Sequence, residues 1–308
     1  MKQPFTYYGG KQKLLPELLK LIPPHIQYVE CFAGGATLFW GKQPSENEVL
    51  NDIDGRITNF YWQLKTNFKE LQTLIHATLH SELLYKESKV VLEDPKETPV
   101  RRAWALWVQT SMTFSSMIHG GFAFGTTGCG DATANRREKF TDMLSHRLQK
   151  VEIFSRTATD LIELKDTPDT FFYCDPPYVS SQQGHYEGYK ESDFLNLLNC
   201  LQNIKGKFLL SSYPEKILLQ YREMMGVDKM GEARGWRWKD DESRVFVTGK
   251  RDGEKKKIEC LTWNFQEPAH QGFLFDSEEM EGEGQTLSER AEELLKNEPM
   301  SERHNEPI

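Results

Sequence analysis

The first part of the chain alternates between short apolar runs and segments with helical spacing of hydrophobic residues. Leucines recur with helical spacing in residues 13–25, until a double proline ends the pattern. The apolar run at 28–32 is followed by a glycine turn and a helical stretch to Trp40. A second strand pattern at 48–54 leads into a helix at 57–65. Such alternation predicts a parallel sheet with crossover helices.

From about Asn67 to Lys150 the pattern changes to long helical stretches without a convincing strand. One helix is predicted to begin with Thr98 as its cap and Pro99 in its first turn. Residues 120–135 are rich in Gly and Thr and are predicted to form a flexible, irregular loop. These features indicate a separate, mainly helical domain inserted into the sheet domain.

Strand patterns return later in the chain, at 151–155, 170–174, 207–212, 244–249 and 257–265. A hairpin-like connection that contains Asp-Gly joins the last two. We therefore predict an α/β fold whose sheet is mostly parallel and ends in an antiparallel C-terminal hairpin. The predicted divisions are a sheet domain in two parts (1–66 and 151–266), the helical insertion (67–150) and a C-terminal tail (267–308).

The composition is that of a globular protein without a membrane span. The 308 residues are 38% hydrophobic and 27% charged, and polar residues interrupt every apolar run that approaches span length. The N-terminus lacks the apolar core of a signal peptide. The five cysteines show no CxxC spacing, which predicts free thiols in a reducing cytoplasm, with neither disulfides nor a metal site.

The net charge of −8 is unevenly distributed. From Glu267 to Ile308 there are 12 acidic and 3 basic residues, so the remaining body carries a net charge of +1. This tail is poor in aromatic residues and is predicted to be largely disordered. Val100 to Lys150 has seven basic residues against three acidic ones, and Arg234 to Lys257 has nine against five. Such local basic patches permit contact with a nucleic acid without establishing it.

A glycine turn and an acidic residue point to a nucleoside ligand. The sequence ECFAGGA, at 30–36, places Gly34 and Gly35 where a strand turns into a helix, and the missing side chains let a ligand approach the backbone. Alone, this turn suits NAD, a flavin, S-adenosylmethionine or simple packing. Asp52 ends the next strand, where a carboxylate can accept hydrogen bonds from both hydroxyls of a ribose.

The stretch FFYCDPPYVS, at 171–180, ends a buried strand with an acid, two prolines and an aromatic residue. The Asp175 carboxylate and the Pro176 carbonyl can accept the two N–H groups of a planar amine, which makes its lone pair available to an electrophilic methyl group. Tyr178 can stack on a base that has left its duplex. Cys174 precedes the acid within an apolar strand, so we expect it to pack rather than to act as a nucleophile.

Three motifs in this order resemble a known family. DPPY at 175–178, YYGGK at 7–11 and VECFAGGATLF at 29–39 are similar to those of Dam-type (class alpha) DNA adenine-N6 methyltransferases. The resemblance covers roughly residues 4–265. It implies a Rossmann-like, S-adenosylmethionine-dependent methyltransferase sheet, with a target-recognition domain inserted between the cofactor and catalytic motifs.

The resemblance also implies roles for individual residues. Asp175, Pro176, Pro177 and Tyr178 are the implied catalytic residues. The implied cofactor-binding residues are Tyr7, Lys11, Glu30, Phe32, Gly34, Asp52, Asp160 and Asp175.

The insertion departs from the Dam pattern, so the resemblance does not imply the recognition sequence GATC. The candidate DNA-binding residues are Gln109, Ser115, His119, Arg136 and Arg137, with Tyr186 or Tyr189 in a loop predicted to close over the extruded base.

We therefore predict a cytoplasmic, bacterial or phage-encoded enzyme that methylates the amino nitrogen of adenine in duplex DNA. DPPY alone does not separate adenine from cytosine or DNA from RNA, and a non-catalytic DNA-binding protein on the same fold is a further alternative. In the tail, QGFLF at Gln271–Phe275 resembles the peptide that docks bacterial proteins onto the replication sliding clamp. The alternative is an apolar patch that folds back onto the body.

Overall fold

The computed structural model describes residues 1–124, 128–178, 188–226, 235–244 and 256–268. These residues lie within one unit, Met1–Pro268. The acidic tail, including the predicted docking peptide Gln271–Phe275, lies outside the described residues.

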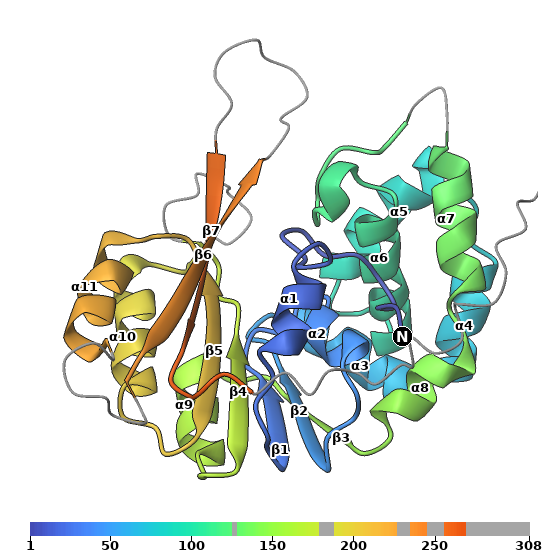
Figure 1. The fold of residues 1–308 in the computed structure, drawn as a ribbon. Coiled ribbons are helices and arrows are strands. Elements are labelled where there is room, and N and C mark those ends of the chain that lie inside the picture. Colours follow the sequence, from blue (N-terminus) through green and yellow to red (C-terminus); the bar gives the residue numbers. More distant parts are fainter. Residues whose placement is uncertain (125–127, 179–187, 227–234, 245–255, 269–308) are drawn as a thin grey trace, which may run out of the picture. The chain divides into compact units, whose positions relative to one another are not determined.

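Seven strands of this unit form one sheet in the order β3-β2-β1-β4-β5-β7-β6 (Figure 1). The first five strands of this order pair in parallel. Strand β7 pairs antiparallel with both of its neighbours, β5 and β6. The strands are β1 Gln27–Glu30, β2 Asn47–Asn51, β3 Val151–Phe154, β4 Thr170–Cys174, β5 Lys207–Ser212, β6 Arg237–Arg244 and β7 Lys256–Trp263. The predicted mostly parallel α/β sheet with antiparallel C-terminal strands is thereby confirmed.

Strand β4 shows why the sheet is covered on both faces. Its five residues are all buried, and the last four alternate between two hydrophobic clusters. Phe171 and Tyr173 face one cluster, whereas Phe172 and Cys174 face the other, as the two-residue period of a strand requires. Cys174 has the packing environment that the sequence predicted for it.

Helices α9, α10 and α11 contribute to the cluster on one face of the sheet, and the remaining helices gather on the other side (Figure 1). The first group is α9 Ala158–Lys165, α10 Glu191–Leu201 and α11 Lys216–Met225. The second group is α1 Leu15–Lys20, α2 Thr37–Gly41, α3 Gly55–Thr66, α4 Phe68–His76, α5 Glu82–Glu93, α6 Pro99–Ser111, the 3-10 turn η1 Phe114–Ser116, α7 Cys129–Glu138 and α8 Asp142–Leu148.

Helix α6 is the central helix of the insertion. It begins as predicted, because the Thr98 side chain accepts a hydrogen bond from the backbone amide of Arg101 and Pro99 occupies the first turn. Ten of its residues are buried, and it contacts α3, α4 and α5. The insertion therefore shares one hydrophobic cluster with the sheet. The division of the chain into domains at residues 67, 151 and 267 stays a prediction.

The loop predicted at 120–135 is partly wrong, since α7 begins at Cys129. Gly128, with a φ of 82°, precedes the helix in the left-handed conformation that favours glycine. A single antiparallel bridge joins Thr113 to Phe122 and closes the segment between them.

The structure describes only the first residue of the strand predicted at 244–249, and it shows a strand before that position which the sequence did not predict. Strand β6 ends at Arg244 and begins at Arg237, in a charged stretch without an apolar run. Among the strands that the structure describes, it lies at the edge of the sheet and pairs with β7 alone, so burial does not impose an apolar pattern on it. Residues 245–249 and the predicted hairpin connection lie outside the described residues.

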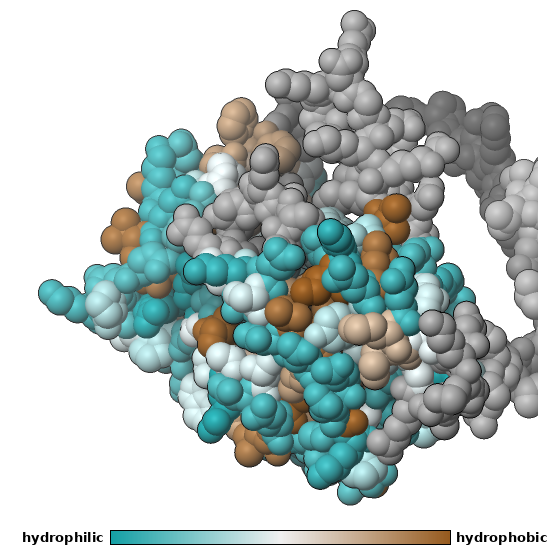
Figure 2. All heavy atoms as spheres, turned by 90° about the vertical axis from the view of Figure 1, so that its left-hand side faces the viewer, coloured by the Kyte–Doolittle hydropathy of each residue, from teal (hydrophilic) through white to brown (hydrophobic). Residues whose placement is uncertain are grey.

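The face that carries α10 and α11 is mainly hydrophilic, with scattered hydrophobic residues (Figure 2). Among the helices that the structure describes, none is long and apolar enough to cross a membrane.

Candidate active site

A cavity of about 690 Å³ lies at the carboxyl ends of β1, β2 and β4. Crevices at this edge are the usual ligand sites of open α/β sheets, and the volume falls in the range of small-molecule pockets, about 300–1,000 Å³. The cavity is lined by residues 7–11, Glu30, residues 32–37, residues 52–54, Arg56, residues 157–159, Tyr173, residues 175–178, Gly188, Tyr189, Asp193, Asn196 and Leu197. All the predicted catalytic residues and all the predicted cofactor residues except Asp160 are among them.

The glycine turn after β1 forms a wall of this cavity. Gly34 has a φ of 45°, and a Cβ atom there would lie 2.9 Å from Cδ1 of Tyr7. The Tyr61 hydroxyl donates to the Gly34 carbonyl over 2.9 Å and so holds the turn from below. The turn therefore needs glycine for both its backbone angle and the packing of Tyr7.

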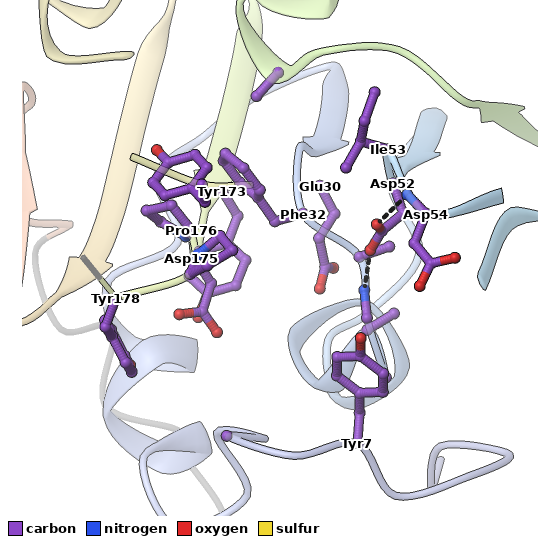
Figure 3. Close-up of a pocket in the computed structure, with 18 of the residues that line it drawn as sticks. Tyr7, Glu30, Phe32, Asp52, Ile53, Asp54, Tyr173, Asp175, Pro176 and Tyr178 are labelled. Carbon is purple, nitrogen blue, oxygen red and sulfur yellow. Dashed lines mark hydrogen bonds between the residues drawn. The ribbon is translucent and has the colours of Figure 1, made fainter. Parts of the chain in front are cut away.

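Asp52 is fixed by two backbone amides at the end of β2. Gly34 donates to Oδ2 over 2.8 Å and Asp54 donates to Oδ1 over 2.9 Å (Figure 3). Burial raises the pKa of Asp52 to about 6, although both amides favour the ionised form. The carboxylate is thus oriented before any ligand arrives, as a ribose-binding group requires.

Glu30 is a second buried carboxyl group in the cavity wall, 2% exposed. Its Oε2 accepts from the Tyr28 hydroxyl over 2.6 Å and from the Phe39 amide over 3.1 Å. Burial raises the pKa of Glu30 to about 8, against the opposing effect of these two donors. A cationic ligand group near Glu30 would offset the cost of ionising this carboxyl group.

Lys11 and Asp175 join the N-terminal segment to the end of β4. The Lys11 ammonium lies 2.8 Å from Asp175 Oδ1. Burial raises the pKa of Asp175 to about 6, while Lys11 opposes the rise. Burial disfavours the Lys11 ammonium, but Asp175 and Glu259 outweigh this effect and hold the pKa of Lys11 above its usual value. The sequence predicted Lys11 beside the cofactor, and the structure places it against the catalytic motif.

Tyr178 is held by contacts that the sequence did not predict. Its ring stacks on Tyr213, with centroids 3.8 Å apart and planes within 11°. Its hydroxyl donates to Glu259 over 2.8 Å, and the same oxygen accepts from Ser211 over 2.7 Å. The only sequence signal for Glu259 was a single acidic residue inside the apolar strand IECLTW.

Asp160 is the one predicted cofactor residue outside the cavity lining. It is exposed in the first turn of α9, and its backbone amide donates to the cap, Thr157, over 3.2 Å. Residues 157–159, directly before it, line the cavity instead. Asp160 therefore lies next to the cavity lining without being part of it, and its predicted contact with the cofactor stays a prediction.

Gln109 does not fit the predicted role of a DNA contact. It is fully buried in α6, where its amide donates to Ser88 over 2.7 Å and to the Tyr85 carbonyl over 3.2 Å. Its carbonyl accepts from the backbone amide of His119 over 3.0 Å. Gln109 thus holds the segment after α6 in place and has no surface to present to a base.

The other candidate DNA contacts differ in their surroundings. The guanidinium of Arg136 donates to the Ser111 carbonyl, and that of Arg137 donates to the Thr78 carbonyl over 3.0 Å. Both arginines therefore anchor α7 to neighbouring backbone. His119 is partly exposed and lies 2.9 Å from Glu93. The Ser115 side chain and Tyr186 lie outside the described residues. Tyr189 packs edge-on against Phe32 in the cavity wall.

A group of three or more His, Cys, Asp or Glu side chains that could hold a metal ion is absent from the residues described. The five cysteines are free thiols, as predicted.

The sheet, the glycine turn and the fixed carboxylates define an α/β protein that binds a nucleoside-type ligand next to an amine-accepting motif. Residues 7–234, more than half of the chain, match the model of the D12 class N6 adenine-specific DNA methyltransferases, and the chain belongs to this family. The predicted S-adenosylmethionine-dependent adenine methyltransferase is thereby confirmed. The match favours adenine in DNA over cytosine, RNA or a non-catalytic protein.

Two relatives have similar sequences. The Type II methyltransferase M1.LlaDCHI of Lactococcus lactis subsp. cremoris is 26% identical over 229 residues, which are 68% of this chain and 80% of the relative. Modification methylase StsI of Streptococcus sanguinis is 23% identical over 241 residues, which are 70% of this chain and 36% of the relative. The chain thus spans little more than a third of this longer protein.

Among solved structures, the putative methyltransferase yhhF from Escherichia coli aligns with 84% of both chains, at 11% identity and a TM-score of 0.33. The family assignment rests on the sequence match rather than on this likeness.

Proposed function

We propose that this protein extrudes a target adenine from duplex DNA and methylates its exocyclic amino nitrogen by direct transfer at a specific sequence. Membership in an adenine-specific DNA methyltransferase family supports the reaction. The observation that carries the proposal is that one cavity holds both the DPPY residues and the fixed carboxylate of Asp52.

The cavity residues fit S-adenosylmethionine. Gly34 packs against the Tyr7 ring, which fills the place of a Cβ atom, and both residues line the cavity. Asp52 presents an oriented carboxylate to a ribose, and Glu30 offers a buried carboxyl group to an ammonium. When bound, the cofactor supplies a methyl group activated by its attachment to a sulfonium sulfur. The other proposed contacts are Tyr7, Lys11, Phe32 and Asp175.

The DPPY residues act on the amine, and Asp175 also lines the part of the cavity proposed for the cofactor. The Asp175 carboxylate and the Pro176 carbonyl accept the two N–H groups, which directs the nitrogen lone pair away from the ring and towards the methyl group. Pro176 and Pro177 stiffen the turn that sets these two acceptors. Tyr178 offers its ring to the base, and the stack on Tyr213 fixes the plane of that ring. Catalysis therefore rests on orientation and electrostatics.

A base must leave the helix to reach these acceptors, because they lie within a cavity. We propose that His119 and the segment from Thr113 to Phe122 contact the DNA, since this segment is held in shape by Gln109 and its own bridge. Arg136 and Arg137 each use part of the guanidinium to bind a backbone carbonyl. They remain candidates for phosphate contact through their other guanidinium N–H groups. Tyr186 and Ser115 stay predictions.

The reaction is tested by transfer of labelled methyl groups from S-adenosylmethionine to unmethylated plasmid DNA. We expect the Asp175→Ala protein to lose at least about a hundredfold in rate. Asp169→Ala is the matched control, because Asp169 is an exposed carboxylate directly before the same strand, β4. Sequencing that detects methylated bases then gives both the base and its sequence context. Transfer to no DNA by folded, cofactor-bound protein would contradict the proposal.

A partner and a cellular location are also proposed. The peptide at Gln271–Phe275 is proposed to dock onto a sliding clamp, which would bring the enzyme to newly copied DNA. Titration of a 266–278 peptide against the cognate clamp tests this, and absence of binding would exclude it. A cytoplasmic location is proposed because the substrate is DNA.

A further inference from the structure

One carboxylate oxygen on β7 binds two residues of the catalytic site. Glu259 Oε1 accepts from the Tyr178 hydroxyl over 2.8 Å and lies 3.4 Å from the Lys11 ammonium. It also accepts from Ser211 of β5 over 2.7 Å. Three donors from three distant parts of the chain thus converge on a single atom.

The position of Glu259 in the sheet explains how it reaches the site. Strand β7 runs antiparallel beside β5, and Cys260 pairs with Ser212, the last residue of β5. Glu259 therefore lies just beyond the carboxyl end of β5, next to the residue that stacks on Tyr178. This is the same edge of the sheet at which β4 delivers the DPPY motif.

A carboxylate at this position raises the free energy of the folded protein unless it stabilises the fold or contributes to the site. Its neighbours Ile258 and Cys260 contribute to the hydrophobic cluster, and Glu259 itself is only 16% exposed. A buried charge costs free energy unless donors compensate it. If the role were only structural, its partners would be expected to belong to the scaffold. Two of the three instead belong to the motifs that form the catalytic cavity.

We propose that Glu259 is a positioning residue for methyl transfer, which holds the Tyr178 hydroxyl and the Lys11 ammonium in fixed places. This rests on the function proposed above. The bond to the hydroxyl sets the rotation of the Tyr178 ring, on which the target base stacks. The attraction to Lys11 keeps the ammonium beside Asp175. There the charge of Lys11 opposes the rise in the Asp175 pKa that burial and Glu259 cause, and so favours the ionised carboxylate that accepts the amine.

The Tyr178 hydroxyl stays a donor throughout. Burial raises its pKa far above the ordinary value, so the phenol remains protonated and Glu259 remains its acceptor. Replacement of Glu259 by glutamine keeps a carbonyl oxygen for Tyr178 and Ser211 but removes the charge that attracts Lys11. Replacement by alanine removes both.

The first experiment measures kcat on unmethylated plasmid DNA and the Kd of S-adenosylmethionine for the wild type, two Glu259 variants and one control. We expect kcat to fall about 10- to 100-fold in Glu259→Gln and further in Glu259→Ala, because small misplacements of reacting groups have effects of this size. The Kd of the cofactor is expected to change less than kcat, by no more than about threefold, since Asp52 and Gly34 are untouched and Lys11 keeps its ion pair with Asp175. Glu152→Gln on β3, whose exposed carboxylate pairs with Lys165, is the matched control and keeps the full kcat.

A double-mutant cycle separates positioning from general loss of structure. If Glu259 acts through the Tyr178 hydroxyl, Tyr178→Phe combined with Glu259→Gln lowers kcat less than the product of the two single effects. Ser211→Ala removes one donor from the same oxygen with little change in volume, and it is expected to lower kcat modestly in the same direction. This variant serves as the test if Glu259 variants do not fold.

Three outcomes overturn the inference. These are unchanged kcat in Glu259→Gln, strictly multiplicative effects in the cycle, or a loss of cofactor binding equal to the loss of kcat. Each presupposes an active wild-type protein. Failure of the proposed function is different, because the wild-type protein itself would then transfer no methyl group to DNA.

Discussion

Gly34 is a single residue on which the shape of the cofactor cavity depends. Its φ of 45° lies where side chains are disfavoured by about 1–2 kcal/mol, and a Cβ would lie 2.9 Å from the Tyr7 ring. We expect Gly34→Ala to raise the Kd of S-adenosylmethionine at least about tenfold, which corresponds to about 1.4 kcal/mol. Isothermal titration calorimetry measures this change.

Gly55→Ala is the matched control for Gly34. Gly55 begins α3, its φ is not positive, and open space surrounds the place where its Cβ would lie. The control is expected to bind the cofactor with the affinity of the wild type. Equal affinities of all three proteins would show that the tight approach at Gly34 is not needed for binding.

The pH dependence of the reaction belongs to Asp175. The ionised carboxylate is a stronger acceptor for an N–H group than the protonated acid, so kcat/KM for DNA is expected to fall as the pH decreases through its pKa of about 6. Burial raises this pKa and Lys11 opposes the rise. Lys11→Gln removes the opposing charge, so the acidic limb of the pH profile moves to higher pH, apart from any loss of rate.

The measurement determines kcat/KM for DNA between pH 5 and pH 9, with saturating cofactor and with DNA well below its KM. Asp52 also has a pKa of about 6, but its burial and the amides of Gly34 and Asp54 set that value, so Lys11→Gln leaves its titration in place. The exposed Lys20→Gln is the control and keeps the wild-type profile. If the acidic limb of the pH profile does not move in Lys11→Gln, the titrating group is Asp52 or another group instead of Asp175.

At the scale of elements, buried strands were predictable and the edge strand was not. The predicted strands at 170–174 and 207–212 coincide with β4 and β5, because a strand buried on both faces is a short apolar run. Strand β6 was not predicted because its charged residues form no such apolar run. Gln109 was misjudged for a related reason: donor chemistry suggested DNA, whereas the burial of α6 assigns the amide to internal hydrogen bonds.

The last helix of the insertion, α8, is attached to β2 through Arg147. Its guanidinium binds both oxygens of Glu48, which is 5% exposed, and lies 3.9 Å from the centroid of the Phe39 ring. We expect Arg147→Ala to lower the free energy of unfolding by about 3 kcal/mol, because it leaves the buried Glu48 with Lys42 as its remaining cation. Urea unfolding measures the loss.

Arg101→Ala on α6 is the control for this ion pair. Arg101 and Glu87 are each more than 40% exposed, and water screens such a pair, so the cost is expected to be below about 1 kcal/mol. Equal costs for the two substitutions would mean that the buried pair is not what attaches α8 to the sheet.

At the scale of the whole unit, the site is assembled from segments that are far apart in the sequence. The resemblance to the family predicted that Lys11, Asp52 and Asp175 lie at one site, and the cavity contains all three. Glu259 was beyond prediction, because its contact with Tyr178 depends on the order β4-β5-β7 in the sheet. The sequence motifs were therefore enough to predict which residues form the site. The residues that hold them in place could be identified only from the strand order of the sheet.

The N-terminal segment connects the insertion, the sheet and the site. The Phe5 side chain is 1% exposed and packs edge-on against Phe60 of α3 at a centroid distance of 4.7 Å. The indole of Trp107 in α6 donates to the Pro4 carbonyl over 3.2 Å. The next residues of the segment, up to Lys11, line the cavity. Core packing of Phe5 is thus expected to determine where Tyr7 and Lys11 lie.

Phe5→Ala tests this connection. We expect it to lower the free energy of unfolding by about 3–5 kcal/mol, as for other large-to-small changes in a core, and also to raise the Kd of S-adenosylmethionine. Phe114→Ala is the control, because Phe114 is 65% exposed and its loss is expected to change stability by less than about 0.5 kcal/mol. Urea unfolding with and without the cofactor gives both quantities. A destabilised Phe5→Ala protein with wild-type cofactor affinity would show that Tyr7 and Lys11 are positioned independently of the core beneath them.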